Sequence, residues 1–387
     1  MFDDGWMIPP GSTIGILGGG QLGRMTALAA RRLGYKIHVF EPQAQSVAGM
    51  IADKEFNAPY QDKTALKAFA QTVDVVTLEF ENIPPQALDW IAETIEVHPS
   101  SNVLSICQNR KREKTFLSEK GFPCAKFVCV DSANSLEKGV TEVGPACVLK
   151  TADFGYDGKG QVKICEGEDV AKVWETFDAP AGVLEEWVPF QAECSVICAR
   201  TKKGKMVTFP MAENRHTRHI LDLSIVPSSL PPQIEAEANS IAQELAESLE
   251  VIGLLAVEFF LTQNGTLLVN ELAPRPHNSG HYTFDACITS QFEQLTRAVC
   301  GLPLGSTQLL SPVVMVNLLG ESWQDAPPDW QVLLSENKAR LDLYDKQPPL
   351  PGRKMGHYCA FGATTKEALK RAEALKCRLT QKVVGCV

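Results

Sequence analysis

Two glutamates in apolar surroundings have the residue type and spacing of a metal site. Glu258 and Glu271 lie in strand-like runs on either side of Asn264-Gly265, the strongest short signal for a hairpin. With these two residues at the centre of the turn, the register places Glu258 directly opposite Glu271 on one face. Like charges opposite each other destabilise a sheet, so we expect a cation between them. Two carboxylates and the amide of Asn270 suit Mg²⁺ shared with nucleotide phosphates; the alternative is a Glu258 that faces solvent on an edge strand.

A second group of residues has the composition of a nucleotide site. Lys150 ends an apolar strand and is followed by the glycine-rich loop 154–160. Glycines allow backbone N–H groups to close over phosphates while lysines offset the phosphate charge; the P-loop pattern is absent, and an ordinary surface turn is the alternative. The run 183–188 suits adenine through backbone hydrogen bonds, and Glu193 suits the ribose hydroxyls. Taken alone, that run is more simply an unremarkable strand.

A first glycine turn lies near the N-terminus. Gly18-x-Gly20-x-x-Gly23 follows the apolar run 13–17, opens a helical pattern and is followed by the acidic Glu41. This arrangement satisfies the dinucleotide fingerprint, so an NAD-dependent oxidoreductase is one hypothesis. Glycines at a helix N-terminus also suit any other phosphate, including that of a ribonucleotide, or form a purely structural turn. The motif alone leaves these possibilities open.

Composition limits the partners. The chain has 387 residues, 44% apolar and 21% charged, which is enough for two or three domains with proper cores. A formal charge of −9 argues against polyanionic partners, so we expect no nucleic acid and no membrane surface. The longest apolar stretch, 251–261, is broken by Glu258, and the first dozen residues carry no basic segment. Without a CxxC pair, signal peptide or membrane span, the expected location is the cytoplasm.

Changes in pattern divide the chain into three predicted domains. Residues 13–17, 21–33 and 36–40 read strand, helix, strand, and the alternation that follows predicts a Rossmann-like α/β domain over 1–106. Residues 107–302 mix strands, a basic helix and a long helix near 233–250, which predicts an α+β pair of lobes, about 107–188 and 189–302. Three strand-like runs and a last helix, 366–375, predict a small C-terminal domain over 303–387.

The chain resembles the N5-carboxyaminoimidazole ribonucleotide synthetase family along nearly its whole length, in the ordered segments GGGQLGRM, EFENIP, LKTADFGYDGKGQ, VLEEWVPFQAECS, VEFFLTQNGTLLVNELAPRPHNSGHYT and PGRKMGH. The resemblance implies the ATP-grasp fold, with a Rossmann-like N-terminal domain, a central two-lobed ATP-binding domain and a small C-terminal domain. It implies that 5-aminoimidazole ribonucleotide, bicarbonate and ATP are converted into N5-carboxyaminoimidazole ribonucleotide, ADP and phosphate in purine biosynthesis. It also suggests a homodimer.

The resemblance carries site residues over by motif. For ATP it implies Arg110, Lys150, Gly155, Tyr156, Asp157, Gly158, Lys159, Gly160, Glu185, Val188, Glu193, His216, Asn270 and Glu271. For magnesium, expected as two ions, it implies Glu258 and Glu271 with Asn270 beside them, the pair that the hairpin predicts independently. For 5-aminoimidazole ribonucleotide it implies Gln21, Leu22, Glu79, Tyr156 and Asp157, with Lys346, Arg353 and Lys354 as cations for the phosphate.

The implied chemistry assigns further roles. Bicarbonate is a poor electrophile, so ATP phosphorylates it to carboxyphosphate, which releases carbon dioxide beside the amine. Magnesium and Lys150 neutralise the triphosphate as the γ-phosphoryl group moves. Arg275, His277 and Asn278 follow directly after the expected metal ligand; we expect Arg275 to bind bicarbonate and His277 to assist proton transfer. The alternative for His277 is a structural histidine packed against Asn278.

Other functions stay open at this point. A formate-dependent glycinamide ribonucleotide transformylase would share the ATP-grasp plan, although HNSGH and PGRKMGH favour the carboxylating enzyme. The oxidoreductase hypothesis leaves the glutamate pair and the second glycine loop unexplained. A non-catalytic nucleotide-binding protein would be expected to have lost a metal ligand or Lys150, and both are present.

Overall fold

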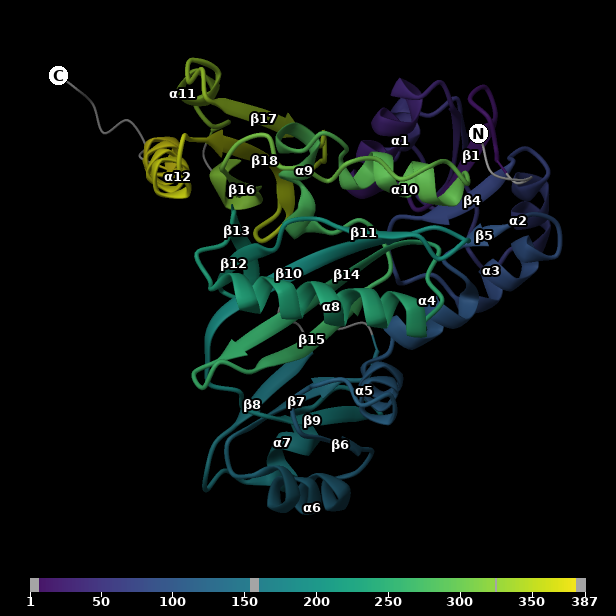
Figure 1. Cartoon of the computed structure of the whole chain (residues 1–387). Helices are drawn as coiled ribbons and strands as arrows, with labels where there is room; N and C mark the ends of the chain where they lie inside the picture. The colour runs from purple at the N-terminus through teal and green to yellow at the C-terminus, as the bar shows by residue number, and fades with distance from the viewer. Residues whose placement is uncertain (1–6, 154–159, 324–325, 381–387) are drawn as a thin grey trace.

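The computed structural model describes residues 7–153, 160–323 and 326–380, and Figure 1 shows them arranged around one large sheet. Five predicted site residues, Gly155, Tyr156, Asp157, Gly158 and Lys159, lie outside the described residues. Within these ranges, no helix combines the length and the apolar character needed to cross a membrane.

The N-terminal region is a parallel sheet with the strand order β3-β2-β1-β4-β5. Its strands are β1 (Thr13–Leu17), β2 (Lys36–Phe40), β3 (Lys54–Phe56), β4 (Val75–Leu78) and β5 (Val97–His98), and its helices are α1 (Gln21–Arg32), α2 (Lys63–Ala70), α3 (Pro85–Ala92) and α4 (Ser101–Cys107). The predicted strand-helix-strand unit is confirmed. In sheets of this kind ligands bind beyond the carboxyl ends of the strands. The glycine turn after β1, Glu41 after β2 and Glu79 after β4 lie at these ends.

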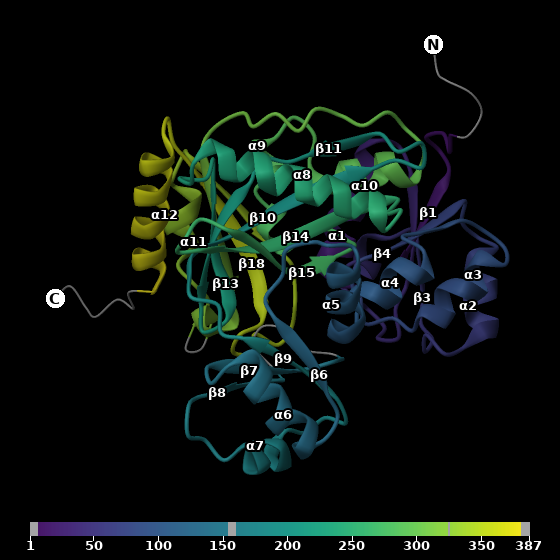
Figure 2. The same cartoon turned by 60° about the horizontal axis from the view of Figure 1, so that its bottom comes forward.

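A small antiparallel sheet, in the order β6-β9-β7-β8, forms the lower lobe in Figures 1 and 2. It contains β6 (Phe127–Val130), β7 (Cys147–Thr151), β8 (Gln161–Ile164) and β9 (Gly182–Glu186), and α6 (Ala133–Val143) and α7 (Val170–Thr176) pack on it. Helix α5 (Arg110–Glu119) precedes this lobe and lies between it and the large sheet. The lobe therefore carries Lys150 on β7 and Glu185 on β9, which are neighbouring strands.

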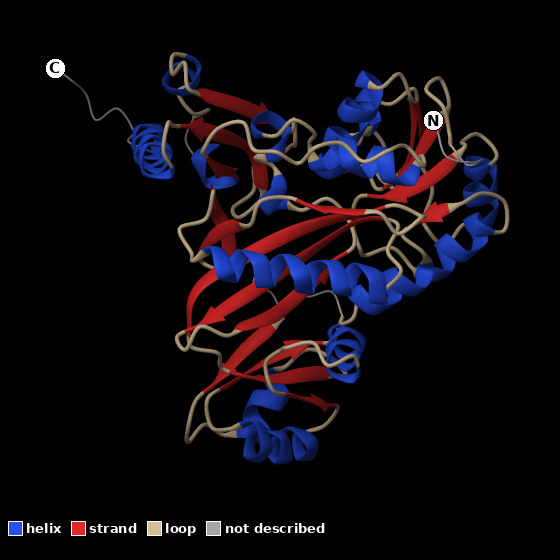
Figure 3. Cartoon of the chain, viewed as in Figure 1, coloured by secondary structure: helices blue, strands red, loops and turns tan. Residues whose placement is uncertain are grey.

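The large sheet follows the order β15-β14-β10-β12-β13-β16-β18-β17, with β11 paired to β10. Its strands are β10 (Phe190–Arg200), β11 (Met206–Thr208), β12 (Ala212–Thr217), β13 (Ile220–Val226), β14 (Gly253–Thr262), β15 (Leu267–Ala273), β16 (Val313–Leu319), β17 (Ala339–Leu343) and β18 (Lys354–Phe361). Helix α8 (Pro232–Ser248) covers one face with an apolar stripe (Figure 3), and α9 (Thr283–Ala286) and α10 (Gln291–Val299) lie between the other face and α1.

The C-terminal strands extend the large sheet. Strand β16 pairs with β13, so the sheet continues through the predicted boundary at residue 302, and the boundaries near 106, 188 and 302 stay predictions. Helix α11 (Trp330–Leu334) and helix α12 (Thr365–Thr380), which is longer than the predicted 366–375, cover these strands. The C-terminal strands β16, β17 and β18 thus belong to the same sheet as β14, the strand that carries Glu258.

The β14–β15 hairpin places its glutamates as predicted, by a different route. The predicted two-residue turn is wrong, because Gly265 lies in the left-handed region (φ 85°) and closes a three-residue loop between Thr262 and Thr266. That loop shifts the register by one residue, which would carry Glu271 to the other face. A β-bulge at Asn270 restores it, and Glu258 pairs with Glu271.

Candidate active site

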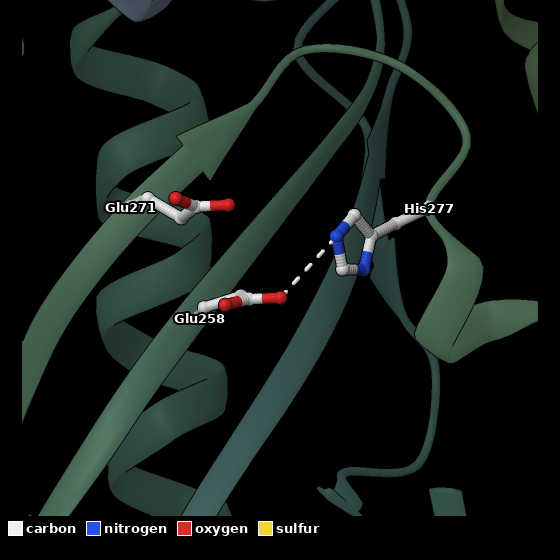
Figure 4. A group of neighbouring side chains, drawn as sticks. All are labelled: Glu258, Glu271 and His277. Atoms are coloured by element: carbon white, nitrogen blue, oxygen red, sulfur yellow. Dashed lines mark ion pairs between the residues drawn. The ribbon is translucent and has the colours of Figure 1, made fainter. Parts of the chain in front are cut away.

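The two carboxylates and an imidazole form one cluster. In Figure 4 the side chains of Glu258 and Glu271 point from neighbouring strands toward His277, and ligand atoms of the three lie within 4.8 Å of one another. The His277 Nε2 atom is 3.3 Å from Glu258 Oε1. Burial and the charge of Glu271 raise the pKa of Glu258 to about 7. The raised pKa shows that the two carboxylates repel each other, which is why a cation between them is expected.

The donor set fits a hard divalent cation. Glu258 and Glu271 offer carboxylate oxygens, and the Oδ1 atom of Asn270 is buried without a hydrogen-bond partner in the described part of the chain. Buried polar atoms are nearly always paired, so an unpaired amide oxygen beside two carboxylates is itself a sign of a missing partner. Oxygen donors of this kind suit Mg²⁺.

Cations from two regions surround the pair. Arg110 Nη1 is 3.8 Å from Glu271 Oε2. Lys150 Nζ is 3.0 Å from Glu185 Oε2, and Lys114 Nζ is 3.4 Å from the same oxygen. Burial alone would raise the pKa of Glu185, but Lys114 and Lys150 hold it at about 2. Burial lowers the pKa of Lys150. Three cations face one buried carboxylate there, which leaves positive charge for an anionic ligand.

Sequence analysis missed Lys114 and its neighbour Glu113. Both are buried although they lie in a strongly polar helical segment, RKREKTFLSE, where lysine and glutamate are expected on the solvent side. Burial raises the pKa of Glu113 to about 8. Only the tertiary contact between α5 and β15 identifies these two residues, and no spacing in the sequence could have found them.

Glu193 and His216 lie side by side on β10 and β12. Their side chains are 2.8 Å apart. Burial lowers the pKa of His216, but the hydrogen bond to Glu193 and the charge of Glu258 raise it above its usual value overall. Val188, just after β9, is half-buried, and Gly160 hydrogen-bonds through its carbonyl to Thr151. Glu193 and His216 therefore lie near Glu258, whereas Gly160 contacts β7, the strand that carries Lys150.

Arg275 forms an ion pair with Glu81, a glutamate of the N-terminal region. Its guanidinium pairs with Glu81 through Nε and through Nη2, the latter 2.9 Å from Oε1, and Nη1 donates to the Pro276 carbonyl at 3.0 Å. Sequence analysis missed Glu81, although EFENIP was among the ordered segments. The pair links the loop after β4 to the strand that carries Glu271, and the bicarbonate role of Arg275 stays a prediction.

A chain of buried hydrogen bonds leads to His277. Its Nδ1 atom is 2.8 Å from Ser279 Oγ, Ser279 Oγ is 2.7 Å from Ser195 Oγ, and Asn214 Nδ2 donates to Ser195 Oγ at 2.9 Å. At its far end Ser224 donates to Asn214 Oδ1 at 2.8 Å. The chain crosses β13, β12 and β10 and fixes the imidazole with Nε2 toward Glu258. Burial and the charge of Arg275 lower the pKa of His277 to about 3.

Asn278 differs from its neighbours in this cluster. Both polar atoms of its amide are buried without a hydrogen-bond partner among the described residues. His277 itself is hydrogen-bonded through Nδ1 to Ser279, as a structural histidine packed against Asn278 would be, so that alternative is not contradicted and the proton-transfer role stays a prediction. The unpaired, buried amide of Asn278 is available to a ligand.

Removing the Ser279 hydroxyl is expected to release His277. Ser279→Ala deletes the partner of Nδ1, so the ring loses its fixed orientation, and we expect kcat to fall about tenfold or more because small misplacements are costly. The two hydrogen bonds lost with the Ser279 hydroxyl, to His277 and to Ser195, should lower the unfolding free energy by about 2 kcal/mol. Steady-state kinetics and urea titration measure both. Ser224→Ala, at the far end of the chain, should change kcat less; equal losses in the two variants would contradict a role specific to His277.

The first glycine turn does not offer a phosphate site. Glu79 accepts from the backbone N–H groups of Gly20 (2.7 Å) and Gly23 (3.0 Å), and Glu41 accepts from that of Gly19 (2.9 Å). These are the donors that a dinucleotide phosphate would use. The protein's own carboxylates occupy them, so the NAD-dependent oxidoreductase hypothesis is wrong for this turn.

The expected cations for the second substrate are only partly brought together. Lys346 lies close enough to Glu79 to lower its pKa against the larger, opposite effect of burial, and Lys354 does the same for Glu258. Lys346 also lines a cavity of about 380 Å³ with Arg24 and Met355. Arg353 instead donates from Nη1 to the carbonyls of residues 347 (2.7 Å) and 348 (3.1 Å).

Residues at the start of α1 reach this region too. Gln21 is half-buried, and Leu22 is buried in a cluster with Phe292 and Tyr344. Helix α1 and Tyr344, just after β17, therefore bring the N-terminal and C-terminal segments into contact, and the substrate roles of Gln21 and Leu22 stay predictions.

The raised pKa of Glu258 predicts how magnesium binding depends on pH. The pKa of Glu258 in the folded protein is about 7, above the ordinary 4.5, so the metal-free protein holds a proton on Glu258 below pH 7. The stability that this bound proton contributes is lost as pH rises through 7. Metal must displace the proton. We expect the Mg²⁺ concentration for half-maximal activity to rise about tenfold per unit as pH falls below about 7. Activity titrations at fixed nucleotide measure this, and a pH-independent requirement would contradict it.

Comparison with known proteins identifies the family. Three family models match in order: a ribonucleotide synthetase preATP-grasp domain over 11–108, an ATP-grasp domain over 115–292 and a phosphoribosylaminoimidazole carboxylase C-terminal domain over 313–371. The fold prediction is thereby confirmed.

Individual relatives agree with these models. The chain is 46% identical to the N5-carboxyaminoimidazole ribonucleotide synthase of Bacillus subtilis over 91% of this chain and 92% of that protein. It is 43% identical to the bifunctional purine synthesis protein purC/E of Dictyostelium discoideum, with 91% of this chain matching only 37% of that longer protein. An ADP complex of N5-carboxyaminoimidazole ribonucleotide synthetase superposes with a TM-score of 0.90 at 44% identity, over 96% of this chain and 98% of that one. The chain therefore belongs to the N5-carboxyaminoimidazole ribonucleotide synthetase family of ATP-grasp enzymes.

Proposed function

We propose that this chain carboxylates 5-aminoimidazole ribonucleotide with bicarbonate at the expense of ATP, giving N5-carboxyaminoimidazole ribonucleotide, ADP and phosphate. One observation supports this most: the facing carboxylates Glu258 and Glu271 lie within 4.8 Å of His277. The family membership supplies the substrates, and the cations around Glu185 supply the charge that a triphosphate needs.

The metal site is assigned to the hairpin. Glu258, Glu271 and the Oδ1 atom of Asn270 would hold Mg²⁺, expected as two ions with the nucleotide. When bound, the metal would neutralise phosphate oxygens and align the γ-phosphoryl group. Arg110 and Lys150 would bind the phosphates from the other side, with the glycine-rich segment 154–160 expected over them. The run 183–188, Glu193 and His216 would take the adenosine.

The chain's own residues would then direct two steps. A bicarbonate oxygen attacks the γ-phosphorus and the bond to ADP breaks, which gives carboxyphosphate. Carboxyphosphate then loses phosphate to give carbon dioxide. The amine of the ribonucleotide attacks the carbon of this carbon dioxide while a proton leaves the amine. Arg275, shared with Glu81, would hold the bicarbonate, and His277 with Asn278 would face the amine. Rigid placement by the Ser279 chain would keep these groups in reach.

The ribonucleotide would lie between α1 and the C-terminal strands. Gln21, Leu22 and Glu79 border that space on one side, with Lys346 and Lys354 on the other. The phosphate role carried over to Arg353 would need its guanidinium to leave the 347 and 348 carbonyls. A homodimer in the cytoplasm is expected from the resemblance, and sedimentation would test the dimer.

Oxygen-isotope transfer tests the proposed chemistry. Bicarbonate fully labelled with ¹⁸O should pass one labelled oxygen to the released phosphate, because the bicarbonate oxygen that attacks phosphorus stays with it. Mass spectrometry of the phosphate reads this directly. Unlabelled phosphate at normal turnover would mean that water attacks ATP and would rule out carboxyphosphate. Formate in place of bicarbonate should support no turnover; if it does, the transformylase alternative is favoured.

A further inference from the structure

Lys114 is a fully buried lysine to which the proposed chemistry gives no contact with substrate or metal. Its side chain is 0% exposed. Its Nζ atom donates to the carbonyl of Asn270 at 3.0 Å and to that of Val269 at 3.4 Å, and it lies 3.4 Å from Glu185 Oε2. The ammonium thus has two hydrogen-bond acceptors and one ion-pair partner. A buried charge is tolerated where such partners offset the loss of water.

Both of those acceptors belong to the bulge that sets the metal site. Strand β15 is the last strand in the order of the large sheet, and on its outer side an isolated parallel bridge joins Val269 to Cys124. Lys114 adds its ammonium to this short outer pairing, at the carbonyls of residues 269 and 270. On the other side of the bulge, Glu113 Oε2 accepts from the backbone N–H of Leu272 at 2.9 Å. One turn of α5 therefore holds residues 269–272 at both ends, with Glu271 between them.

The ion-pair partner of Lys114, Glu185, belongs to the small lobe. Glu185 on β9 accepts from Lys150 on β7 at 3.0 Å. A single ammonium thus connects the bulge of the large sheet to the carboxylate that positions Lys150. Loss of the bulge would shift the register by one residue and turn Glu271 away from Glu258.

We propose that Lys114 is a positioning residue that holds the metal-binding bulge of β15 and the Glu185–Lys150 pair in one geometry, so that magnesium-dependent nucleotide binding depends on it. This inference rests on the proposed metal role of Glu258 and Glu271. It makes Lys114 a part of the active site that touches neither substrate nor metal.

The test is Lys114→Met, which keeps the length of the side chain and removes its donors. Calorimetry should show at least tenfold weaker binding of ADP in the presence of Mg²⁺, with ADP binding in EDTA changed less than threefold. The Mg²⁺ concentration for half-maximal phosphate release should rise at least fivefold, with KM for 5-aminoimidazole ribonucleotide within twofold of wild type. Lys111→Met is the matched control, because Lys111 is exposed on the same helix; it should match wild type throughout.

A lower melting temperature with a wild-type magnesium requirement would show that Lys114 only stabilises the fold, and would overturn the proposal. If Lys114→Met does not fold, Glu113→Leu perturbs the same bulge from its other side. Glu113→Gln keeps an acceptor for the Leu272 N–H. The leucine variant should raise the magnesium requirement and the glutamine variant should not; equal requirements would overturn the proposal. Absence of magnesium dependence in the wild type would instead contradict the proposed function itself.

Discussion

Replacing Glu271 by alanine lowers the rate of ATP-dependent phosphate release at least a hundredfold while the fold survives. The loss follows from removing a ligand that would offset charge on the transferring phosphoryl group, worth about 3 kcal/mol of barrier or about a hundredfold in rate. The fold survives because Glu271 stands opposite Glu258 in the ladder, and removing one of two facing like charges removes a repulsion. The melting temperature of the ligand-free variant should equal or exceed that of wild type, and the upward shift caused by MgADP should disappear.

Glu247→Ala is the control for this experiment, because Glu247 is an exposed glutamate on α8, outside the hairpin. It should leave both turnover and the MgADP shift at wild-type values. A Glu271→Ala variant that keeps turnover within a few-fold of wild type would contradict the metal assignment. One that fails to fold would show that the pair is structural instead.

Lys150→Met should abolish turnover to a similar degree without destabilising the ligand-free protein. Lys150 and Lys114 both lie beside the buried Glu185, so removing one lysine leaves the carboxylate paired with the other. It also removes a like-charge repulsion and the cost of a buried ammonium. We expect kcat to fall at least about a hundredfold and MgATP binding to weaken, with unfolding free energy changed by less than about 1 kcal/mol.

Glu185→Gln tests the same charge cluster from the side of the carboxylate. It leaves Lys114 and Lys150 facing each other without a carboxylate, so urea titration should show a loss of about 3–5 kcal/mol, the usual penalty for an uncompensated buried charge. If Lys150→Met were the less stable of the two variants, the charge balance described for this cluster would be wrong. If it kept normal turnover, the phosphate role of Lys150 would fail.

The strand-helix-strand unit and the glutamate pair could be predicted because both depend on local sequence patterns. Apolar alternation and the first glycines define β1, α1 and β2, and Asn-Gly defines a hairpin. The turn itself was predicted with one residue too few. The pairing of Glu258 with Glu271 was right because the bulge at Asn270 cancels the error, and a bulge depends on contacts from another element.

Features that depend on distant contacts could not be predicted. Lys114 and Glu113 are buried by the packing of α5 on β15, whereas their neighbours in sequence are polar. The glycine turn satisfies a phosphate motif, but whether its N–H groups are free depends on Glu79, far along the chain. The pairing of β16 with β13, which joins the C-terminal strands to the large sheet, is likewise a long-range choice that strand patterns do not specify.

Phosphate release from MgATP and bicarbonate, with and without 5-aminoimidazole ribonucleotide, tests the proposed function most directly. We expect strong stimulation by the ribonucleotide, formation of carboxylated product in equal amount to phosphate, no response to formate and loss of the stimulated rate in Glu271→Ala. Absence of ATP turnover with any combination of these substrates would contradict the proposed carboxylation and leave the cluster of Glu258, Glu271 and His277 without its assigned chemistry.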